Sequence, residues 1–510
     1  MRIRSAGERS LLVDLGSMPA VHGLWRALRD DPPEGAVDVV AGAATVLVTL
    51  GSGAHVRAAE GHIAKLLRRA GAGPPEAAEK VIPVVYDGPD LDELAALAGM
   101  GRSEAIRLHS SASYTVAFLG FSPGFAYLAG APAPLHLPRL ATPRTSVPAG
   151  SVAVAAGMTA VYPQPTPGGW RLIGRTDTAM FDPVRPDPAL LRPGDRVRFR
   201  PVGAVGTPPP MAPAAPASAG AGYLQVVDPG PLTTVQDLGR PGWAHLGVPR
   251  SGAADRSAAG EANRLVGNPP GAAVLEATLA GPVLRMGTRR RVAVTGAPAE
   301  IRVDGLPARA GAALELGAGA ELAIDRFRSG ARCYVAVQGG IASPLVLGSR
   351  STDTLSGLGP AVLRAGDRLP LGEPGPAPAP DPDALPAPTA PGAPGPVIVV
   401  PAHPGPRDDW VGRRGLDTLG GGAFEVVASS DRTGLRLRGP RVEVERGGQL
   451  PSEGMVAGAV QIPPDGQPIV LLRNHPTTGG YPVAAVVTDA GLDLLAQARP
   501  GVTVCFRLLR

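Results

Sequence analysis

Apolar and polar residues alternate over much of this 510-residue chain, in short runs that predict β-strands. Helical spacing is concentrated near the N-terminus, at residues 18–30 and 54–71. Strand-like runs precede, separate and follow these helices at residues 11–15, 45–50 and 81–86. We interpret this arrangement as the βαββαβ order of a small ferredoxin-like α+β domain.

Further helix ends are marked by capping residues. Asp90 and Glu93 have the spacing of a capping box at the start of a helix over residues 90–99. Asp255 can cap another helix, which Gly267 would end because glycine readily adopts the left-handed conformation found after helices. Gly71 is expected to end the helix over residues 54–71 in the same way.

Three similar phrases divide the chain into modules. LLRPGDRVRF (190–199), VLRAGDRLPL (362–371) and AQARPGVTVCF (496–506) each place a glycine turn before an alternating run. We interpret them as the closing strands of three related β modules, with chance similarity as the alternative. The Pro/Ala/Gly-rich segments 203–222 and 373–396 have no periodic apolar pattern and are predicted to be linkers.

Composition agrees with a turn-rich soluble protein. Glycine (69 residues) and proline (59) are abundant and aromatic residues make up 4%, as expected for many short strands joined by turns. No apolar run reaches the roughly 18 residues needed to cross a bilayer. The N-terminus lacks the apolar segment of a signal peptide. We therefore expect a cytoplasmic protein without membrane partners.

The distribution of charged residues, cysteines and histidines argues against nucleic-acid binding, cysteine chemistry and a metal site. The net charge is +5, but the basic residues are scattered and only Lys65 and Lys80 are lysines, so we expect no nucleic-acid partner. Cys333 and Cys505 lie in alternating apolar runs, which favours buried thiols over a disulfide or a nucleophile. The eight histidines show no HxxxH or HExxH spacing, so no metal site is expected.

Two stretches of the first half carry candidate chemistry. Residues 108–130 contain a GFSPGF loop whose glycines would let the backbone approach a ligand, although a tight turn beneath aromatic side chains would look the same. Residues 143–177 contain arginines whose planar fork suits a carboxylate, although surface arginines are more common. The candidate substrate-binding residues here are Ser122, Gly124, Phe125, Arg144, Gln164 and Arg175.

Two stretches of the second half are also rich in side chains that could bind a ligand or take part in catalysis. Residues 229–268 combine amide, carboxylate, imidazole and hydroxyl groups, and residues 474–487 place two threonines before a Gly-Gly turn. Such hydroxyls can hold an oxyanion, but a β-turn without a ligand would have the same sequence. The candidate substrate-binding residues here are Gln236, His245, Ser251, Gly252, Arg432, Thr477 and Thr478.

His109, Asp237 and Tyr481 are the candidate catalytic residues. His109, His245 and His475 all lie in the dense stretches, and an ordinary structural role is the alternative for each. The chain contains neither GxxxxGK[ST] nor GxSxG. We therefore expect acid–base and electrostatic chemistry in a composite cleft, completed by a second protein or a mobile cofactor.

The first half resembles a known family. GFSPGFAYL (120–128), PRTSVPAGSVAVAAGMTAVYP (143–163) and GGWRLIGRTD (168–177) closely resemble the allophanate hydrolase subunit 1 family. That family includes the B subunit of bacterial 5-oxoprolinase and a kinase inhibitor. The likeness therefore covers both dense stretches of this half.

The second half resembles the companion subunit 2 family, which includes the C subunit of 5-oxoprolinase. The matching segments are TTVQDLGR (233–240), GVPRSGAAD (247–255), AVQGGIASPLVLGSRST (336–352), PGPRDDW (404–410) and PTTGGYP (476–482). Family members commonly read Asp-Arg-Gln before the two threonines and lysine after the proline. This chain has Asn474, His475 and Pro476 before them and Val483 after, so its substrate choice can differ.

The resemblance implies a mainly β fold class with an α+β part, in which a ferredoxin-like domain precedes three cyclophilin-like β-barrels. We expect the following boundaries: 1–82 for the ferredoxin-like domain, 83–202 for the first barrel, 203–222 for a linker, 223–372 for the second barrel, 373–396 for a linker and 397–510 for the third barrel.

The resemblance also implies a fused B and C component of ATP-dependent 5-oxoprolinase, an amide hydrolase that opens the lactam of 5-oxo-L-proline to L-glutamate. A separate large A-type subunit is the expected partner, and the ATP site cannot be placed on this chain. In this hypothesis Arg144 or Arg175 binds the substrate carboxylate, and His109 and Asp237 transfer protons. Thr477, Thr478 and Tyr481 would donate to a carbonyl or oxyanion.

Two alternatives follow from the same resemblance. The chain could be a carboxyltransferase for urea or a similar small amide, with biotin carried by another chain because no biotinyl lysine motif occurs here. It could instead be a regulatory binding protein of the kinase-inhibitor type. The oligomeric state is left open.

Overall fold

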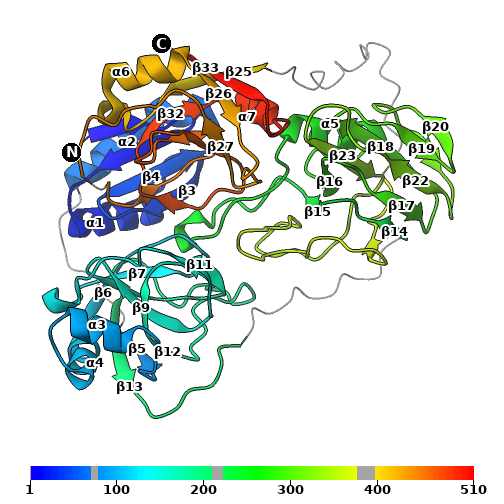
Figure 1. The fold of residues 1–510 in the computed structure, drawn as a ribbon. Coiled ribbons are helices and arrows are strands. Elements are labelled where there is room, and N and C mark those ends of the chain that lie inside the picture. Colours follow the sequence, from blue (N-terminus) through cyan, green and yellow to red (C-terminus); the bar gives the residue numbers. More distant parts are fainter. Residues whose placement is uncertain (1, 70–78, 210–221, 376–396, 449, 510) are drawn as a thin grey trace.

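The computed structural model describes residues 2–69, 79–209, 222–375, 397–448 and 450–509. Figure 1 shows the N-terminal sheet beside the C-terminal barrel, with the first and second barrels on different sides of this pair. The expected mainly β fold class, with an α+β part, is confirmed. Among the described residues, no helix is both long enough and apolar enough to span a membrane.

The N-terminal domain is an antiparallel sheet of order β1-β2-β4-β3 with two helices. Its elements are β1 (Arg2–Ser5), β2 (Ser10–Asp14), α1 (Met18–Asp30), β3 (Ala36–Ala41), β4 (Thr45–Leu50) and α2 (Val56–Arg69). The helices bury apolar stripes that include Leu24 and Ile63 against the sheet. The expected helix end at Gly71 lies outside the described residues.

One strand of the expected βαββαβ order belongs elsewhere. β5 (Glu79–Val84) pairs in parallel with β13 (Arg196–Pro201) of the first barrel and is not part of the N-terminal sheet. The reason is that Ile82 and Val84, on one face of β5, are fully buried in the barrel core. The N-terminal sheet has β1 as its additional strand instead.

The first barrel contains a seven-stranded sheet of order β12-β9-β10-β7-β6-β13-β5 and a two-stranded sheet, β11-β8. Its other elements are α3 (Leu91–Leu97), α4 (Arg102–Ser111), β6 (Tyr114–Leu119), β7 (Ala126–Ala129), β8 (Arg144–Val147), β9 (Ser151–Ala155), β10 (Met158–Val161), β11 (Thr166–Gly168) and β12 (Arg171–Arg175). The predicted capping box is wrong. The Asp90 side chain makes no cap bond and instead accepts from Arg144 (2.6 Å) and from the Leu172 backbone N–H (2.7 Å).

The second barrel is built from a six-stranded and a five-stranded sheet. Its elements are β14 (Tyr223–Asp228), β15 (Thr233–Gln236), α5 (Arg256–Val266), β16 (Val274–Thr278), β17 (Val283–Met286), β18 (Arg290–Gly296), β19 (Ile301–Val303), β20 (Leu306–Ala308), β21 (Leu314–Leu316), β22 (Glu321–Ile324), β23 (Arg332–Val337) and β24 (Arg368–Pro370). Helix α5 has the predicted caps. Asp255 accepts from the Ala258 N–H at 2.9 Å, and Gly267 is left-handed with φ of 80°.

The third barrel is closed, in the order β25-β32-β29-β30-β27-β26-β33. Its elements are β25 (Val397–Pro404), α6 (Asp408–Gly421), β26 (Ala423–Val426), β27 (Gly434–Arg438), β28 (Glu453–Gly454), β29 (Ala459–Gln461), β30 (Ile469–Leu471), β31 (Thr478–Gly479), β32 (Val483–Val487), α7 (Asp489–Leu495) and β33 (Thr503–Leu508). Cys505 on β33 and Cys333 on β23 are free thiols; Cys333 is fully buried and Cys505 only partly.

The three repeated phrases do end in closing strands. Each phrase leads into the last strand of a module, and that strand pairs with the first strand of the same module. β13 pairs with β5 in parallel, β24 pairs with β14 antiparallel, and β33 pairs with β25 in parallel. The prediction from the repeat is therefore confirmed.

A cluster of ion pairs joins the N-terminal sheet to the third barrel. Arg407 donates to Glu453 within its own barrel (Nε–Oε2 3.0 Å) and to Asp14 of the N-terminal sheet (Nη1–Oδ2 3.1 Å). Arg4 pairs with the same Asp14 at 2.9 Å and with Asp409 at 3.3 Å. We call these five residues the Arg407 cluster. It gives the PGPRDDW segment a structural role at the junction of the two halves.

Candidate functional site

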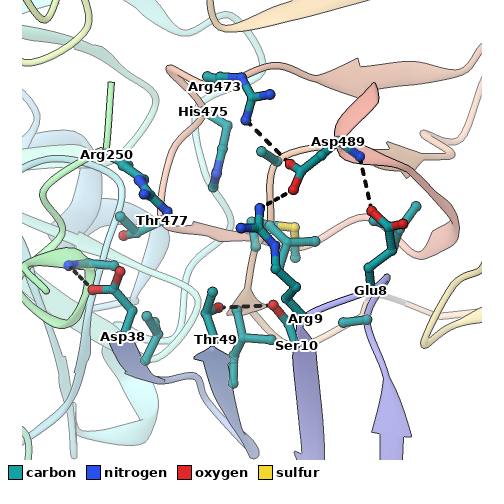
Figure 2. A pocket seen from close by; sticks show the side chains of 18 of the residues that line it. Glu8, Arg9, Ser10, Asp38, Thr49, Arg250, Arg473, His475, Thr477 and Asp489 are labelled. Atoms are coloured by element: carbon teal, nitrogen blue, oxygen red, sulfur yellow. Dashed lines mark hydrogen bonds and ion pairs between the residues drawn. The ribbon is translucent and has the colours of Figure 1, made fainter. Parts of the chain in front are cut away.

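A cavity lies where the N-terminal sheet, the second barrel and the third barrel meet (Figure 2). Its volume is about 100 Å³, enough for several water molecules or one small organic molecule. The N-terminal sheet and its turns contribute Ala6, Glu8, Arg9, Ser10, Asp38, Val40, Leu47 and Thr49. The second barrel contributes Ala244, Arg250 and Arg256, and the third contributes Met455, Val456, Ala457, Arg473, His475, Thr477, Val486, Val487 and Asp489.

Positive charge exceeds negative charge in the described lining of this cavity. Four arginines face three carboxylates, which leaves one positive charge when His475 is neutral. Asp489 is shared between Arg9 (2.5 Å) and Arg473 (3.4 Å), and its backbone N–H donates to Glu8 at 3.1 Å. Arg473 also pairs with Asp493 at 3.0 Å, so Arg9 and Arg473 both have carboxylate partners; Figure 2 shows their contacts with Asp489.

The guanidinium groups of Arg250 and Arg256 have fewer hydrogen-bond and ion-pair partners. The structure gives the Arg250 side chain no hydrogen bond or ion pair with any described residue, and its Nε is buried without a partner. Burial lowers the pKa of Arg250, and the charge of Asp38 partly opposes this effect. Arg256 donates from Nη2 to the Leu238 carbonyl at 3.1 Å, but its Nε has no partner among the described residues. Burial, followed by the charges of Arg473 and Arg250, lowers the pKa of Arg256 to about 9.

His475 and Thr477 provide neutral polar groups on the same wall. Nδ1 of His475 lies 2.8 Å from the Pro476 carbonyl oxygen, which can only accept, so in the neutral ring Nδ1 carries the hydrogen. Burial lowers the pKa of His475 to about 4, and Arg250 acts in the same direction, so the ring is neutral near pH 7. The Thr477 hydroxyl is buried and has no partner in the part of the chain that the structure describes.

Asp38 connects the N-terminal sheet to the loop of the second barrel. Its carboxylate accepts from the Ala244 backbone N–H at 3.0 Å. Burial raises the pKa of Asp38, while the Ala244 and Gly242 N–H groups and the charge of Arg250 oppose the shift. The cavity wall formed by β3 is therefore held to the second barrel by a direct side-chain contact.

Of the predicted substrate-binding and catalytic residues, Thr477 lines this cavity, and so does His475, one of the three histidines singled out from the sequence. The structure places the others outside its described lining. The glycine-rich loops of the two halves do meet beside it. The Gly124 N–H donates to the Leu246 carbonyl at 2.8 Å, and the Gly120 Cα packs so closely on Thr478 that a Cβ there would lie 2.0 Å from the threonine hydroxyl. Ser122 is buried in the same contact.

The remaining candidates of the first half lie within the first barrel. His109 on α4 is 1% exposed, and its ring nitrogens contact the Tyr86 hydroxyl (2.7 Å) and the Thr159 hydroxyl (2.9 Å). Burial lowers its pKa to about 3, which fits a structural, uncharged histidine. Arg144 pairs with Asp90, and Arg175 with Asp87 at 2.8 Å. Phe125 packs in an aromatic core and Gln164 lies in a partly buried turn.

Asp237 organises backbone in the second barrel. Its carboxylate accepts from the Gly239 N–H (2.7 Å), the Arg350 N–H (2.6 Å) and the hydroxyls of Ser349 (2.7 Å) and Ser351 (2.5 Å). These bonds tie the loop after β15 to residues 349–351. The position supports a structural role and lies away from the lining of the cavity.

The other candidates of the second half also make structural contacts. Gln236 and Ser251 are fully buried and donate to the Thr352 carbonyl, each at 3.0 Å. Arg432 joins the second and third barrels by bonding Glu276 and the Gly252 carbonyl.

His245 and Tyr481 line other hollows. His245 stacks on Trp243 in a smaller cavity that also includes Trp25 of α1, and burial lowers its pKa to about 4. Tyr481 is 44% exposed in a groove of the third barrel that also includes Arg436 and Pro464. Gly124, Asp237 and Tyr481 therefore do not share one described cavity.

Sequence reasoning missed most of the charged lining. Arg250 lies inside the GVPRSGAAD segment and Arg473 directly precedes Asn474, so both could have been singled out from motifs. Arg9, Asp38 and Asp489 carry no local signal, because their role depends on three modules meeting.

The chain belongs to the carboxyltransferase-domain family. Residues 1–191 match the model described as carboxyltransferase domain, subdomain C and D, and residues 246–508 match subdomain A and B. The cavity is lined by residues from both matched regions.

The similar proteins bear out the resemblance to both subunit families. The chain is 55% identical over 130 residues to the 5-oxoprolinase B subunit of Escherichia coli O157:H7, covering 25% of this chain and 60% of that subunit. It is 36% identical over 288 residues to the 5-oxoprolinase C subunit of E. coli K12, covering 56% of this chain and 90% of that subunit. Urea amidolyase of Lachancea kluyveri is 34% identical over 56% of this chain and 17% of that protein.

A solved structure spans both halves in one polypeptide. The crystal structure of TTHA0988 matches with a TM-score of 0.85 and 36% identity, over 98% of this chain and 99% of that one. The arrangement of a half similar to the B subunit followed by a half similar to the C subunit is thus shared along the whole chain.

Proposed function

We propose that this chain is the fused B and C component of an ATP-dependent 5-oxoprolinase. The observation that carries the proposal is that one cationic cavity is lined by both the B-type half and the C-type half. Relatives that bear the names of the B and C subunits of 5-oxoprolinase match these halves in order. A cavity divided in this way requires both halves, whether they occur as two chains or as one.

The reaction would break the lactam C–N bond of 5-oxo-L-proline. A water oxygen forms the new bond to the carbonyl carbon and the nitrogen takes up a proton, which gives L-glutamate. An amide carbonyl is a poor electrophile, so the conversion of ATP and water to ADP and phosphate drives the step. The chain has no GxxxxGK[ST] motif. We therefore assign ATP to a separate large subunit and substrate binding to this cavity.

The test is reconstitution with a candidate large subunit. The two proteins are co-expressed and co-purified, and glutamate release from 5-oxoproline is measured with and without ATP. We expect ATP-dependent release that falls at least roughly tenfold in Arg250→Gln, because a buried charged donor is lost. Arg413→Gln, on an arginine whose side chain is 94% exposed, is the matched control. A stable complex without glutamate release would contradict the proposal.

A carboxyltransferase acting on urea or a similar small amide is the second candidate. The family model and the urea amidolyase relative favour it. In that case biotin would be carried by another chain, and the cavity would bind the acceptor amide. Co-purification of a biotinylated protein, together with amide-dependent loss of its carboxyl group, would select this function over lactam hydrolysis.

A further inference from the structure

The cavity contains hydrogen-bonding groups that no described residue satisfies. Within the described part of the chain, Arg250 has its whole guanidinium without a partner, the Thr477 hydroxyl is buried and unpaired, and Nε2 of His475 has no partner. Buried polar groups in folded proteins are nearly always satisfied, by protein, water or ligand. These three side chains point toward the same space in Figure 2. They therefore indicate the ligand that the cavity accepts.

The three groups differ in what they can offer. Arg250 only donates, and its planar fork matches the two oxygens of a carboxylate. His475 presents a lone pair at Nε2, because its single hydrogen is engaged by Pro476. Thr477 can either donate or accept. The cavity thus combines an anion-binding side with an acceptor for an N–H group.

The charge and the volume of the cavity narrow the class of ligand further. Arg9 pairs with Asp489, and Arg473 pairs with Asp489 and Asp493. Arg256 donates to the Leu238 carbonyl, whereas the Arg250 guanidinium has no partner among the described residues, so Arg250 is the arginine best placed for an added anion. No ion pair joins Asp38 and Arg250 among the described residues, and the described lining has one excess positive charge, which favours a ligand with a single negative charge. A volume of about 100 Å³ favours a small molecule over a nucleotide. A second carboxylate would set its oxygen lone pairs against Nε2 of His475.

We propose that Arg250 binds the carboxylate of the substrate and that Nε2 of His475 accepts its amide N–H, so that these two residues set the ligand specificity of the cavity. The inference rests on the proposed function for the identity of the ligand, 5-oxoproline. The donor and acceptor pattern comes from the described contacts. His475 is a binding and specificity residue here, and it need not transfer a proton.

Calorimetric titration of the purified full-length chain tests the ligand class. The probes are 5-oxoproline, 3-oxocyclopentanecarboxylate, in which CH2 replaces the N–H and the carbonyl is kept, and 2-pyrrolidinone, which lacks the carboxylate. We expect 5-oxoproline to bind best, with each analogue weaker by roughly tenfold or more, because each leaves one polar group of the cavity without a partner. Equal binding of 5-oxoproline and 3-oxocyclopentanecarboxylate would overturn the assignment to His475.

Three variants assign the contacts. Arg250→Gln should weaken 5-oxoproline at least roughly tenfold, and Arg413→Gln should leave it unchanged. His475→Leu should bind 5-oxoproline and 3-oxocyclopentanecarboxylate about equally, because the acceptor for the N–H is gone. His475→Gln should keep part of the discrimination, since its side-chain oxygen can accept the N–H. Discrimination that survives in His475→Leu would refute the contact even where that variant folds less well.

The outcomes separate this inference from the proposed function. If the reconstituted complex releases glutamate but the chain alone binds none of the probes, the cavity assignment is wrong and the function stands. If the chain binds 5-oxoproline with the expected variant pattern but no complex releases glutamate, the cavity assignment stands and the hydrolase proposal is wrong.

Discussion

His109 and His475 look alike in the sequence, since each imidazole lies in a stretch rich in glycine and hydroxyl groups. The structure separates them through their partners. His109 is enclosed by Tyr86 and by Thr159, which follows fifty residues later, whereas His475 has one nitrogen engaged by its neighbour Pro476. Because such partners come from distant segments, a residue's role could not be predicted from local sequence.

Burial of His109 makes a prediction about acid stability. Its pKa falls from the ordinary 6.5 to about 3, so on acidification the unfolded chain takes up the proton first. Stability from this residue is complete above pH 6.5 and is lost progressively as the pH falls toward 3. At pH 5 the loss amounts to about 2 kcal/mol.

Urea unfolding at pH 7 and pH 5 measures this effect. In His109→Asn the difference in unfolding free energy between the two pH values should shrink by about 2 kcal/mol relative to the unmodified chain. His55→Asn, at a partly exposed histidine, should leave the difference unchanged. An unaltered difference in His109→Asn would show that this residue does not govern the acid response.

At the scale of helices and strands, the sequence predicted a feature correctly where the residues that determine it lie close together in the chain. Helix α5 has both predicted caps because Asp255 and Gly267 act on backbone within a few residues. Asp90 failed as a cap because Arg144 and Leu172, brought close by the barrel, offer its carboxylate stronger bonds. Strand β5 was assigned to the wrong sheet for the same reason, since its partner β13 lies at the far end of the first half.

Asp237 connects two elements and carries the next prediction. Its carboxylate satisfies two backbone N–H groups and two serine hydroxyls. Asp237→Ala leaves these donors unpaired and should lower the free energy of unfolding by about 3 kcal/mol. Asp237→Asn keeps one acceptor oxygen and should cost less.

Urea denaturation at pH 7 is the measurement, with Asp417→Ala, at an exposed position on α6, as the control. Should Asp237→Ala unfold like the unmodified chain while glutamate release is abolished, the catalytic role first predicted for Asp237 would replace the structural one.

At the scale of the whole molecule, the repeated closing phrases predicted the module ends, and the sequence also predicted a composite cleft, but most of the charged residues that line the cavity could not be foreseen. The three repeated sequence segments predict the closing strands because each contains its own glycine turn, followed by alternating apolar and polar residues. The cavity has no such signal, because its wall combines residues from both ends of the chain, Glu8 near one and Asp489 near the other.

The Arg407 cluster predicts that the two halves hold together without a covalent link. A protease site placed within residues 203–222 and then cut should leave both fragments eluting as one species in size-exclusion chromatography. Arg407→Met should raise the dissociation constant of the cut protein by roughly a hundredfold, because Glu453 is left buried without its partner. Arg413→Met is the control, and separation of the fragments in the unsubstituted protein would contradict the prediction.

The pairing of β14 with β24 sets Tyr223 directly across from Pro370. The polypeptide thus enters and leaves the second barrel at neighbouring points. In the other two barrels the first and last strands are parallel, so the chain enters at one end of the pair and leaves at the other. A unit with adjoining entrance and exit can be inserted into a host gene or exchanged between relatives without stretching the flanking chain. The second barrel is accordingly the module that recombination could most easily have moved.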